Sequence, residues 1–196
     1  ITIVEGETTY CNFNLEPVTW LKGQVRDGAA QGPLPGATVD IFKDGLLWQS
    51  TSSGSPWGVY EIYLTLHDGL PANDCIVRAS KQGYVRQYKW GVDIPLGEAT
   101  YVNFNLQPSG KLRGQVRDRV TGVPIIYAVV RAYHGGLLWA TAMTTPPWGV
   151  YEIDSDLPEG TYVVQAIRPG YLPQAKWPVQ VSAGSTTYVN FFLQPD

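Results

Sequence analysis

The sequence predicts an all-β protein that consists of two tandem seven-stranded β-sandwich domains and one surplus β-strand. The chain has 196 residues with 21 glycines, 15 prolines and 12% aromatic residues, a composition typical of short strands joined by frequent turns. An internal repeat covers most of the chain, and one strand-like segment occurs three times. Because glycine and proline interrupt every window that is long enough for a long helix, we expect none.

The internal repeat indicates a duplicated domain. The motif LKGQVRD at residues 21–27 recurs as LRGQVRD 91 positions later, and PWGVYEI at residues 56–62 recurs unchanged at the same offset. The offset then falls to 87, so the first copy contains four extra residues, which we place within residues 66–74. A repeat of this length is too long for a solenoid. We therefore expect a first domain at residues 18–108 and a second at residues 109–196.

The segment that occurs three times is predicted to be a β-strand that closes a sandwich. The copies lie at residues 8–17, 99–108 and 186–195. In the middle copy, alternation turns Val102, Phe104 and Leu106 toward the core. Two domains need only two closing strands. The surplus copy is residues 8–17 if the next copy closes the first domain, or residues 186–195 if the first copy does so.

We assign residues 1–17 to an N-terminal surplus strand that resembles a donor strand. Cys11, Phe13 and Leu15 take its inward positions, and Tyr10 takes an outward one. An unpaired strand with an apolar face tends to pair with another chain. Tyr10, Cys11, Phe13 and Leu15 are therefore predicted to form a partner-binding strand.

Alternation also orients strands inside the domains. Residues 59–62 place Tyr60 and Ile62 on one face. In the first domain, the same reasoning turns Cys75 and Val77 toward the core.

Several motifs follow the order found in a known family. Residues 23–27 (GQVRD), 33–39 (PLPGATV) and 57–62 (WGVYEI) precede a Tyr-x-Val-x-Ala strand, a Gly-Tyr pair and a Val-Asn-Phe-x-Leu strand. The chain thus resembles the carboxypeptidase regulatory-like domain, twice and over nearly its whole length. This resemblance implies a prealbumin-like (transthyretin-like) sandwich related to collagen-adhesin B-type repeats. It also implies a spacer, accessory or interaction module on an extracellular chain.

Collagen-adhesin B-type repeats often carry a Lys–Asn isopeptide bond that a Glu assists. Here Ala79 and Ala166 stand at the places of that Glu, and Arg113 is the second-domain counterpart of Lys22. The comparison with that family therefore implies no such crosslink, and Asn103 is expected to be an outward polar residue.

Charge and motif content argue against catalysis. The net charge is −3 without a basic cluster, whereas nucleic-acid binding needs clustered lysine and arginine. His67 and His134 lie outside metal-ligand spacings, and Glu61 and Glu152 are expected to pair across strands with basic residues. No apolar run reaches the 18 residues typical of a spanning helix. We expect no enzyme activity, cofactor, metal, nucleic-acid partner or membrane span.

Tryptophan supplies candidate contacts with glycans or at interfaces. The seven are Trp20, Trp48, Trp57, Trp90, Trp139, Trp148 and Trp177. Six of them form three repeated pairs, which favours packing in the cores or between domains, because each copy of a domain needs the same packing. The alternative is stacking on sugar rings, which makes glycans a candidate partner.

Cys11 and Cys75 are the two cysteines. Both take predicted inward positions, which favours a disulfide between them and an oxidising compartment. Two buried free thiols are the alternative. The sequence leaves open whether such a disulfide lies within one chain or between two.

The leading functional hypothesis is a structural subunit of an extracellular filament or surface fibre. Such a subunit would form a homopolymer with neighbouring copies, head to tail, by β-strand addition. One alternative is a fragment of a tandem-repeat cell-surface spacer or adhesin, and another is a carbohydrate-binding accessory module. Because the sequence opens within a strand-like segment, we also expect a processed N-terminus or an excised fragment.

Overall fold

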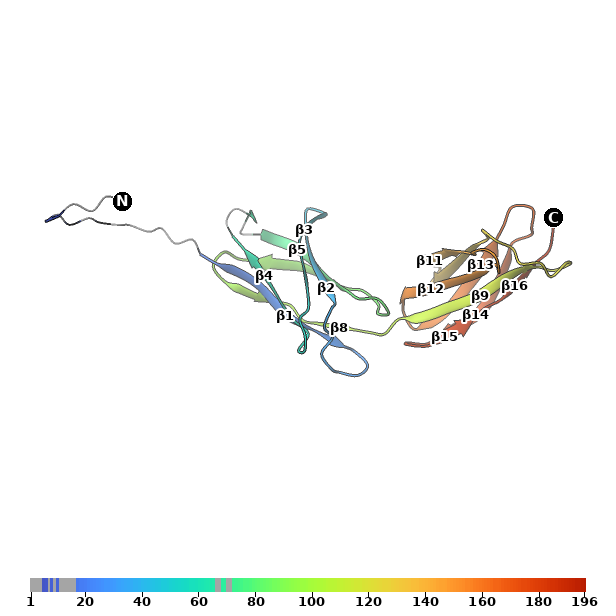
Figure 1. Cartoon of the computed structure of the whole chain (residues 1–196), viewed down its shortest axis with the longest axis horizontal. Coiled ribbons are helices and arrows are strands. Elements are labelled where there is room, and N and C mark those ends of the chain that lie inside the picture. Colours follow the sequence, from blue (N-terminus) through green and yellow to red (C-terminus); the bar gives the residue numbers. More distant parts are fainter. Residues whose placement is uncertain (1–4, 7, 9, 11–16, 66–67, 70–71) are drawn as a thin grey trace.

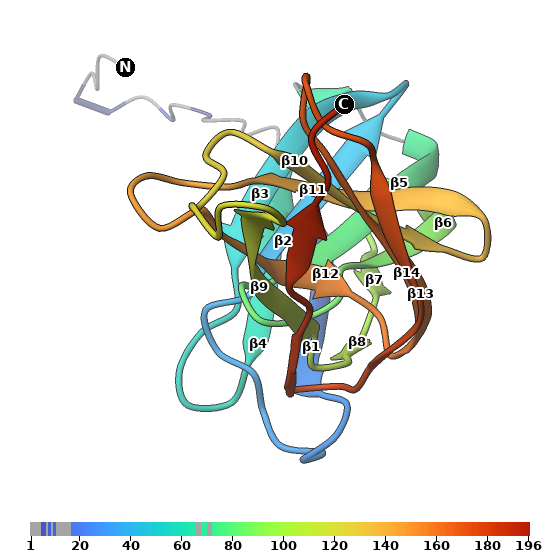
Figure 2. The same cartoon turned by 90° about the vertical axis from the view of Figure 1, so that its right-hand side faces the viewer.

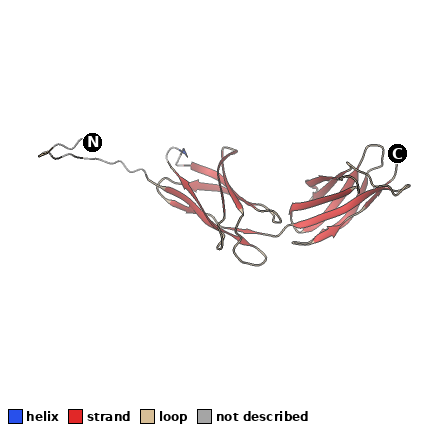
Figure 3. Ribbon diagram, in the orientation of Figure 1, coloured by secondary structure: helices blue, strands red, loops and turns tan. Residues whose placement is uncertain are grey.

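Two β-sandwiches follow one another along the long axis of the chain (Figure 1). The structure is a computed structural model that describes residues 5–6, 8, 10, 17–65, 68–69 and 72–196. Within these residues every named element is a β-strand, which confirms the predicted all-β class. Figure 3 colours these strands red. The domain boundaries after residues 17 and 108 stay a prediction.

The first sandwich consists of two sheets. Its strands are β1 (Thr19–Asp27), β2 (Thr38–Lys43), β3 (Leu46–Ser52), β4 (Val59–Leu64), β5 (Ala72–Ser80), β6 (Gln87–Ile94), β7 (Ala99–Tyr101) and β8 (Phe104–Leu106). One sheet has the order β4-β1-β7, with β8 also on β1, and the other has the order β3-β2-β5-β6.

The second sandwich repeats this arrangement. Its strands are β9 (Gly110–Asp118), β10 (Val129–His134), β11 (Leu137–Met143), β12 (Val150–Leu157), β13 (Gly160–Ile167), β14 (Gln174–Val181), β15 (Thr186–Tyr188) and β16 (Phe191–Leu193). The sheets are β12-β9-β15, with β16 also on β9, and β11-β10-β13-β14. Figure 2 looks onto this sandwich from its end of the chain.

Each sandwich has a separate hydrophobic core between its two sheets. The predicted inward residues of the closing strand, Val102, Phe104 and Leu106, are all buried. So are Tyr60 and Ile62 on β4. The alternation of apolar residues therefore predicted which face of these strands packs against the core.

The closing strand of each sandwich is divided into two short strands. β7 and β8 both run parallel to β1, beside residues 20–22 and 25–27 respectively. β15 and β16 pair in the same way with β9. Residues 99–108 thus close the first sandwich and residues 186–195 the second. The surplus copy is the segment at residues 8–17.

A tyrosine–aspartate pair fixes the end of the first strand in each sandwich. The Tyr84 hydroxyl donates to Asp27 Oδ2 at 2.7 Å, and the Tyr171 hydroxyl donates to Asp118 Oδ2 at 3.0 Å. The same carboxylates accept backbone N–H groups of the turn that follows. Each carboxylate therefore joins its turn to the strand-connecting segment that carries the tyrosine.

These hydrogen bonds favour the charged form of both carboxyl groups. The N–H of Ala30, and then the Tyr84 hydroxyl, lower the pKa of Asp27. The N–H of Thr121 is the largest cause of the lowered pKa of Asp118. In turn, the Asp27 carboxylate raises the pKa of Tyr84 to about 12.

A polar clasp joins the two sandwiches. The Arg86 N–H donates to Asp156 Oδ1 at 2.8 Å, and the Arg86 guanidinium forms an ion pair with Asp156 Oδ2. The Leu157 N–H donates to Ser109 Oγ of the linker at 2.8 Å. Pro173 is the counterpart of Arg86 in the second domain, so the far end of that domain lacks the arginine side of this clasp.

We predict that Asp27→Asn and Asp118→Asn lower the stability at pH 7 and flatten its loss in acid. A carboxyl group whose pKa is lowered by folding contributes stability that is complete above its unfolded pKa of about 3.9. That contribution is lost as the pH falls through the lower folded pKa. Urea unfolding between pH 7 and pH 2 measures both effects. Glu98→Gln is the control, since this exposed side chain has no hydrogen bond in the described structure. Equal acid sensitivity in all variants would contradict a stabilising role of the Asp27 and Asp118 carboxylates.

Candidate strand-binding sites

The closing strand approaches the first strand of each sandwich at a glycine. A Cβ atom on Gly23 would lie 1.9 Å from the carbonyl oxygen of Val102, and one on Gly114 would lie 1.9 Å from that of Val189. No side chain fits at such distances, so both positions require glycine. The two backbones therefore meet directly at this point.

Side-chain hydrogen bonds fix the break in each closing strand. The Tyr60 hydroxyl donates to the Val102 carbonyl at 2.5 Å, and the Gln24 N–H donates to Asn103 Oδ1 at 2.8 Å. Burial raises the pKa of Tyr60, which keeps its hydroxyl protonated as a donor. Asn103 takes the place of a backbone acceptor, since the strand changes its pairing between Val102 and Asn103.

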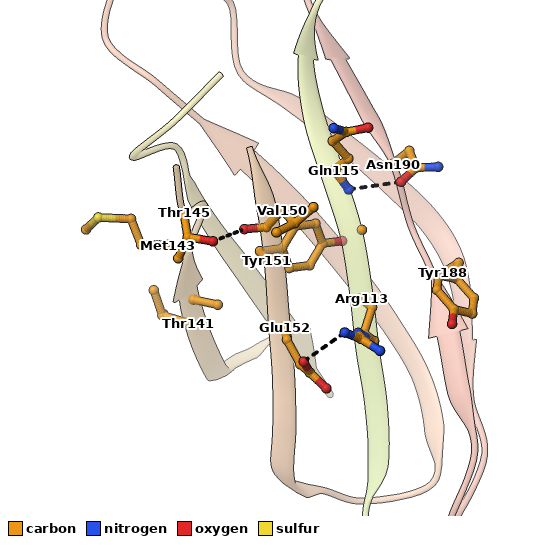
Figure 4. Close-up of a pocket in the computed structure, with 12 residues that line it drawn as sticks. Arg113, Gln115, Thr141, Met143, Thr145, Val150, Tyr151, Glu152, Tyr188 and Asn190 are labelled. Atoms are coloured by element: carbon orange, nitrogen blue, oxygen red, sulfur yellow. Dashed lines mark hydrogen bonds and ion pairs between the residues drawn. The ribbon is translucent and has the colours of Figure 1, made fainter. Parts of the chain in front are cut away.

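The second sandwich repeats these contacts. The Tyr151 hydroxyl donates to the Val189 carbonyl at 2.6 Å, and the Gln115 N–H donates to Asn190 Oδ1 at 2.9 Å (Figure 4). Burial also raises the pKa of Tyr151. Because two sandwiches with different sequences keep the same set, these contacts constitute a general means of holding this strand.

A glutamine from the opposite sheet adds one more contact. Gln87 Oε1 accepts the Asn105 N–H at 3.2 Å, and Gln174 Oε1 accepts the Phe192 N–H at 3.1 Å. We call each set a closing-strand site; the two sets are Gly23, Gln24, Tyr60 and Gln87, and Gly114, Gln115, Tyr151 and Gln174. Sequence reasoning did not assign these roles, although all eight residues recur in the repeat.

The structure confirms that Glu61 and Glu152 each form an ion pair with a basic residue of the neighbouring strand. Lys22 Nζ lies 3.0 Å from Glu61 Oε1, and Arg113 lies 3.3 Å from Glu152. Asn103 is exposed, as predicted, and its side-chain oxygen is engaged by the backbone of β1. The paired Lys22 is therefore held by a carboxylate of β4.

Most of the surplus copy lies outside the described residues, including Cys11, Phe13 and Leu15. Tyr10 is described and exposed. Its counterpart in the second closing strand, Tyr188, is also exposed. The partner-binding strand therefore stays a prediction.

The disulfide likewise stays a prediction, because Cys11 lies outside the described residues. Cys75 is 0% exposed in the first core, and burial raises the pKa of its thiol. A bond to Cys75 would thus require Cys11 to enter the core of the first sandwich. The second domain has Tyr162 at the equivalent position, so it offers no matching thiol.

A groove lies on the second sandwich beside the edges of β11 and β12 (Figure 4). Its volume is about 760 Å³. Its floor includes the Arg113–Glu152 ion pair, which the figure marks with a dashed line. We call it the β11–β12 groove and define it by Arg113, Thr141, Met143, Thr145, Val150 and Glu152.

Most of the tryptophans lie on the surface rather than in the cores. Those at positions 57, 90, 148 and 177 are 65% to 73% exposed. Trp48 packs against the first core, and Trp20 meets Tyr63 edge to face with ring centroids 5.3 Å apart. Trp139 is partly exposed and donates to the Asp156 carbonyl at 2.5 Å. These four rings therefore do not pack in the cores, and their contacts at interfaces or with glycans stay predictions.

Within the described part of the chain, no group of three or more His, Cys, Asp or Glu side chains is placed to hold a metal ion. His134 stacks on the buried Tyr162 with ring centroids 4.7 Å apart. His67 lies outside the described residues. No helix in the described part is long and apolar enough to cross a membrane.

The second sandwich defines a domain class. Residues 111–194 match the family model of the carboxypeptidase regulatory-like domain, which confirms the resemblance for this domain. The first sandwich has the same strand order and the same closing-strand site. No curated protein matches the chain.

Several solved structures are similar to the chain. The Bacillus anthracis TIE protein is 20% identical, with a TM-score of 0.39. The match covers 91% of this chain and 34% of the TIE protein. A streptococcal ancillary pilin is 13% identical (TM-score 0.42), covering 91% and 62%. A shaft pilin from Lactobacillus rhamnosus GG is 10% identical (TM-score 0.43), covering 93% and 98%. The chain thus spans less than two thirds of the first two, and TM-scores of this size establish no shared function.

We predict that Tyr151→Phe destabilises the second sandwich by about 1–3 kcal/mol, because the buried Val189 carbonyl loses its hydroxyl partner. Tyr188→Phe is the matched control, since the Tyr188 hydroxyl is exposed and has no hydrogen bond within the described structure. Thermal and urea unfolding measure both variants. An equal, small effect of the two substitutions would show that the hydroxyl does not hold the closing strand.

Proposed function

We propose that this chain is a structural subunit of an extracellular filament or surface fibre. Copies join head to tail when residues 8–17 of one subunit pair as a β-strand with the next subunit. A contact between two different surfaces of the same molecule does not close on itself and therefore builds a fibre. The proposed role is mechanical and non-catalytic, with no cofactor.

The observation that carries this proposal is the number of closing strands. Both closing-strand sites are filled from within the chain, by residues 99–108 and 186–195. Residues 8–17 carry the same pattern of apolar and polar positions. Within the described part of the chain, no closing-strand site is therefore left for residues 8–17.

The surplus strand gains free energy by finding a partner. The counterparts of Phe13 and Leu15 in the first closing strand, Phe104 and Leu106, are almost wholly buried. Full burial of such side chains stabilises by about 1.5–3 kcal/mol each. An added strand also gains main-chain hydrogen bonds along a sheet edge.

Exchange of one closing strand for another between copies would still leave one strand of each copy without a partner. If residues 8–17 displaced residues 186–195 of a neighbour, the displaced strand would lose its own partner. Every copy in a fibre would still contain three such strands and two closing-strand sites. Addition at a separate, unfilled edge pairs all three, and it is the form of assembly that we propose.

A tandem array in a longer cell-surface protein is the second candidate. Asn12 stands at the place of Asn103 and Asn190, whose side chains accept a backbone N–H of the first strand. Residues 8–17 therefore also have the residues needed to close a sandwich that precedes them in the chain. In that arrangement the two-domain chain is a monomer in solution.

We predict that Phe13→Asp abolishes assembly as completely as deletion of residues 1–17. A carboxylate on the apolar face would have to be buried without a partner, which costs far more than a buried apolar group gains. Asn14→Asp is the matched control, because it places the same charge on the outward face and leaves assembly intact. Sedimentation velocity and negative-stain images measure the outcome.

Two results would contradict the proposal. One is a wild-type chain that stays a monomer at high concentration, as the tandem array predicts. The other is a deletion variant that forms fibres as well as the wild type does.

A further inference from the structure

We propose that the β11–β12 groove of the second sandwich is the acceptor for residues 8–17 of a second copy. This inference rests on the proposed function and specifies where the contact forms. The occupant is one segment of this same chain. It lies as an added strand along the free edge of β11, over the groove.

The groove has two free strand edges. Among the described residues, β11 hydrogen-bonds along its length only to β10, and β12 only to β9. At one end the two edges are joined by the Thr145 N–H, which donates to the Val150 carbonyl at 2.8 Å. At the other end the Trp139 indole N–H donates to the Asp156 carbonyl. Between these two ties, the outer edge of β11 has no strand partner among the described residues.

The β11 edge lacks the features that normally prevent strand pairing. Its sequence, LLWATAM, contains no charged residue and no proline, and Leu137, Leu138 and Met143 are exposed. The other outer edges of the second sandwich are protected, and β12 carries Glu152, Asp154 and Asp156. β14 carries Lys176 and Pro178, and β15 and β16 have three residues each.

The two sandwiches differ at this edge, which gives the contact a direction. Residues 140–143 of β11 are Ala-Thr-Ala-Met, whereas residues 49–52 of the equivalent β3 are Gln-Ser-Thr-Ser. Ser50 is also engaged, since its hydroxyl donates to Asp40 at 2.6 Å. An apolar strand face therefore finds apolar neighbours on the second sandwich and polar ones on the first. The N-terminal segment of one copy thus meets the second domain of another, which is a head-to-tail contact.

The segment suits the groove in charge as well as in pattern. Glu16 is the one charged residue in the sequence of residues 8–17, and residues 8–15 contain none. The charges in the groove floor, Arg113 and Glu152, already neutralise one another at 3.3 Å. An uncharged strand therefore enters without leaving a buried charge unpaired. Its face of Cys11, Phe13 and Leu15 turns toward the groove, on the outward side of β12 and β9.

The test compares Met143→Lys with Ser52→Lys in the full chain. The two positions are equivalent, and both are exposed at the end of an edge strand. Met143→Lys places an ammonium group in the proposed contact and raises the concentration needed for assembly at least about tenfold, equivalent to about 1.4 kcal/mol. Ser52→Lys leaves it unchanged. Sedimentation velocity over a concentration series measures both, and thermal unfolding confirms that each variant folds.

A second variant replaces the β11 edge with its own first-domain counterpart. Ala140→Gln, Thr141→Ser, Ala142→Thr and Met143→Ser together convert the edge to the polar sequence of β3. Loss of assembly by a folded protein supports the inference. Asn12→Ala separates the two kinds of site, since a strand in the groove does not need the asparagine contact of a closing-strand site and assembly persists.

Three outcomes overturn the inference. If Met143→Lys and the four-residue variant assemble like the wild type, while Phe13→Asp does not, the segment binds elsewhere and the proposed function stands. If Asn12→Ala abolishes assembly, the segment occupies a closing-strand site. If the wild type remains a monomer, the proposed function fails together with this inference.

Discussion

Each sandwich depends on the direct contact between two backbones at Gly23 and at Gly114. The closing strand comes so close there that the carbonyl oxygen of the residue opposite occupies the space of a Cβ atom. Tyr60 or Tyr151 satisfies that carbonyl from within the core, and an asparagine side chain replaces the missing backbone acceptor. The contact joins the closing strand to the two other strands of its own sheet, β1 and β4 in the first sandwich and β9 and β12 in the second. A sandwich without it would lose the edge of that sheet.

The same contact explains why the third copy of the strand matters. Each closing-strand site accepts one strand. The chain fills both sites with the strand at the end of the same domain, residues 99–108 and residues 186–195. The two sandwiches are otherwise not equivalent. The clasp from Arg86 to Asp156 exists once, and β11 presents an apolar edge where β3 presents a polar one. A chain with different ends can join its copies in only one orientation, which a fibre requires.

The sequence predicted the features that follow from local periodicity, and it missed those that depend on tertiary contacts. The repeat predicted two similar sandwiches, and alternation placed Phe104 in the core. Asn103 was correctly predicted to be an outward polar residue. Its bond to the Gln24 N–H was missed, because that bond depends on a break in the strand that alternation does not reveal. Trp90 was expected to pack in a core or at an interface; the register of β5 and β6 shifts beside it and the ring lies outside the core. The β11–β12 groove depends on which edges stay unpaired, and periodicity carries no information about that.

Electron cryo-microscopy of the protein at high concentration tests the central claim most directly, because it shows where residues 8–17 lie in an assembly. The account predicts fibres of sandwiches joined end to end. In them, both closing-strand sites of every copy are filled by its own strands, and the segment at residues 8–17 lies along the β11 edge of the next copy. Separate two-domain particles would contradict the account, and so would fibres in which residues 8–17 replace residues 186–195 beside β9.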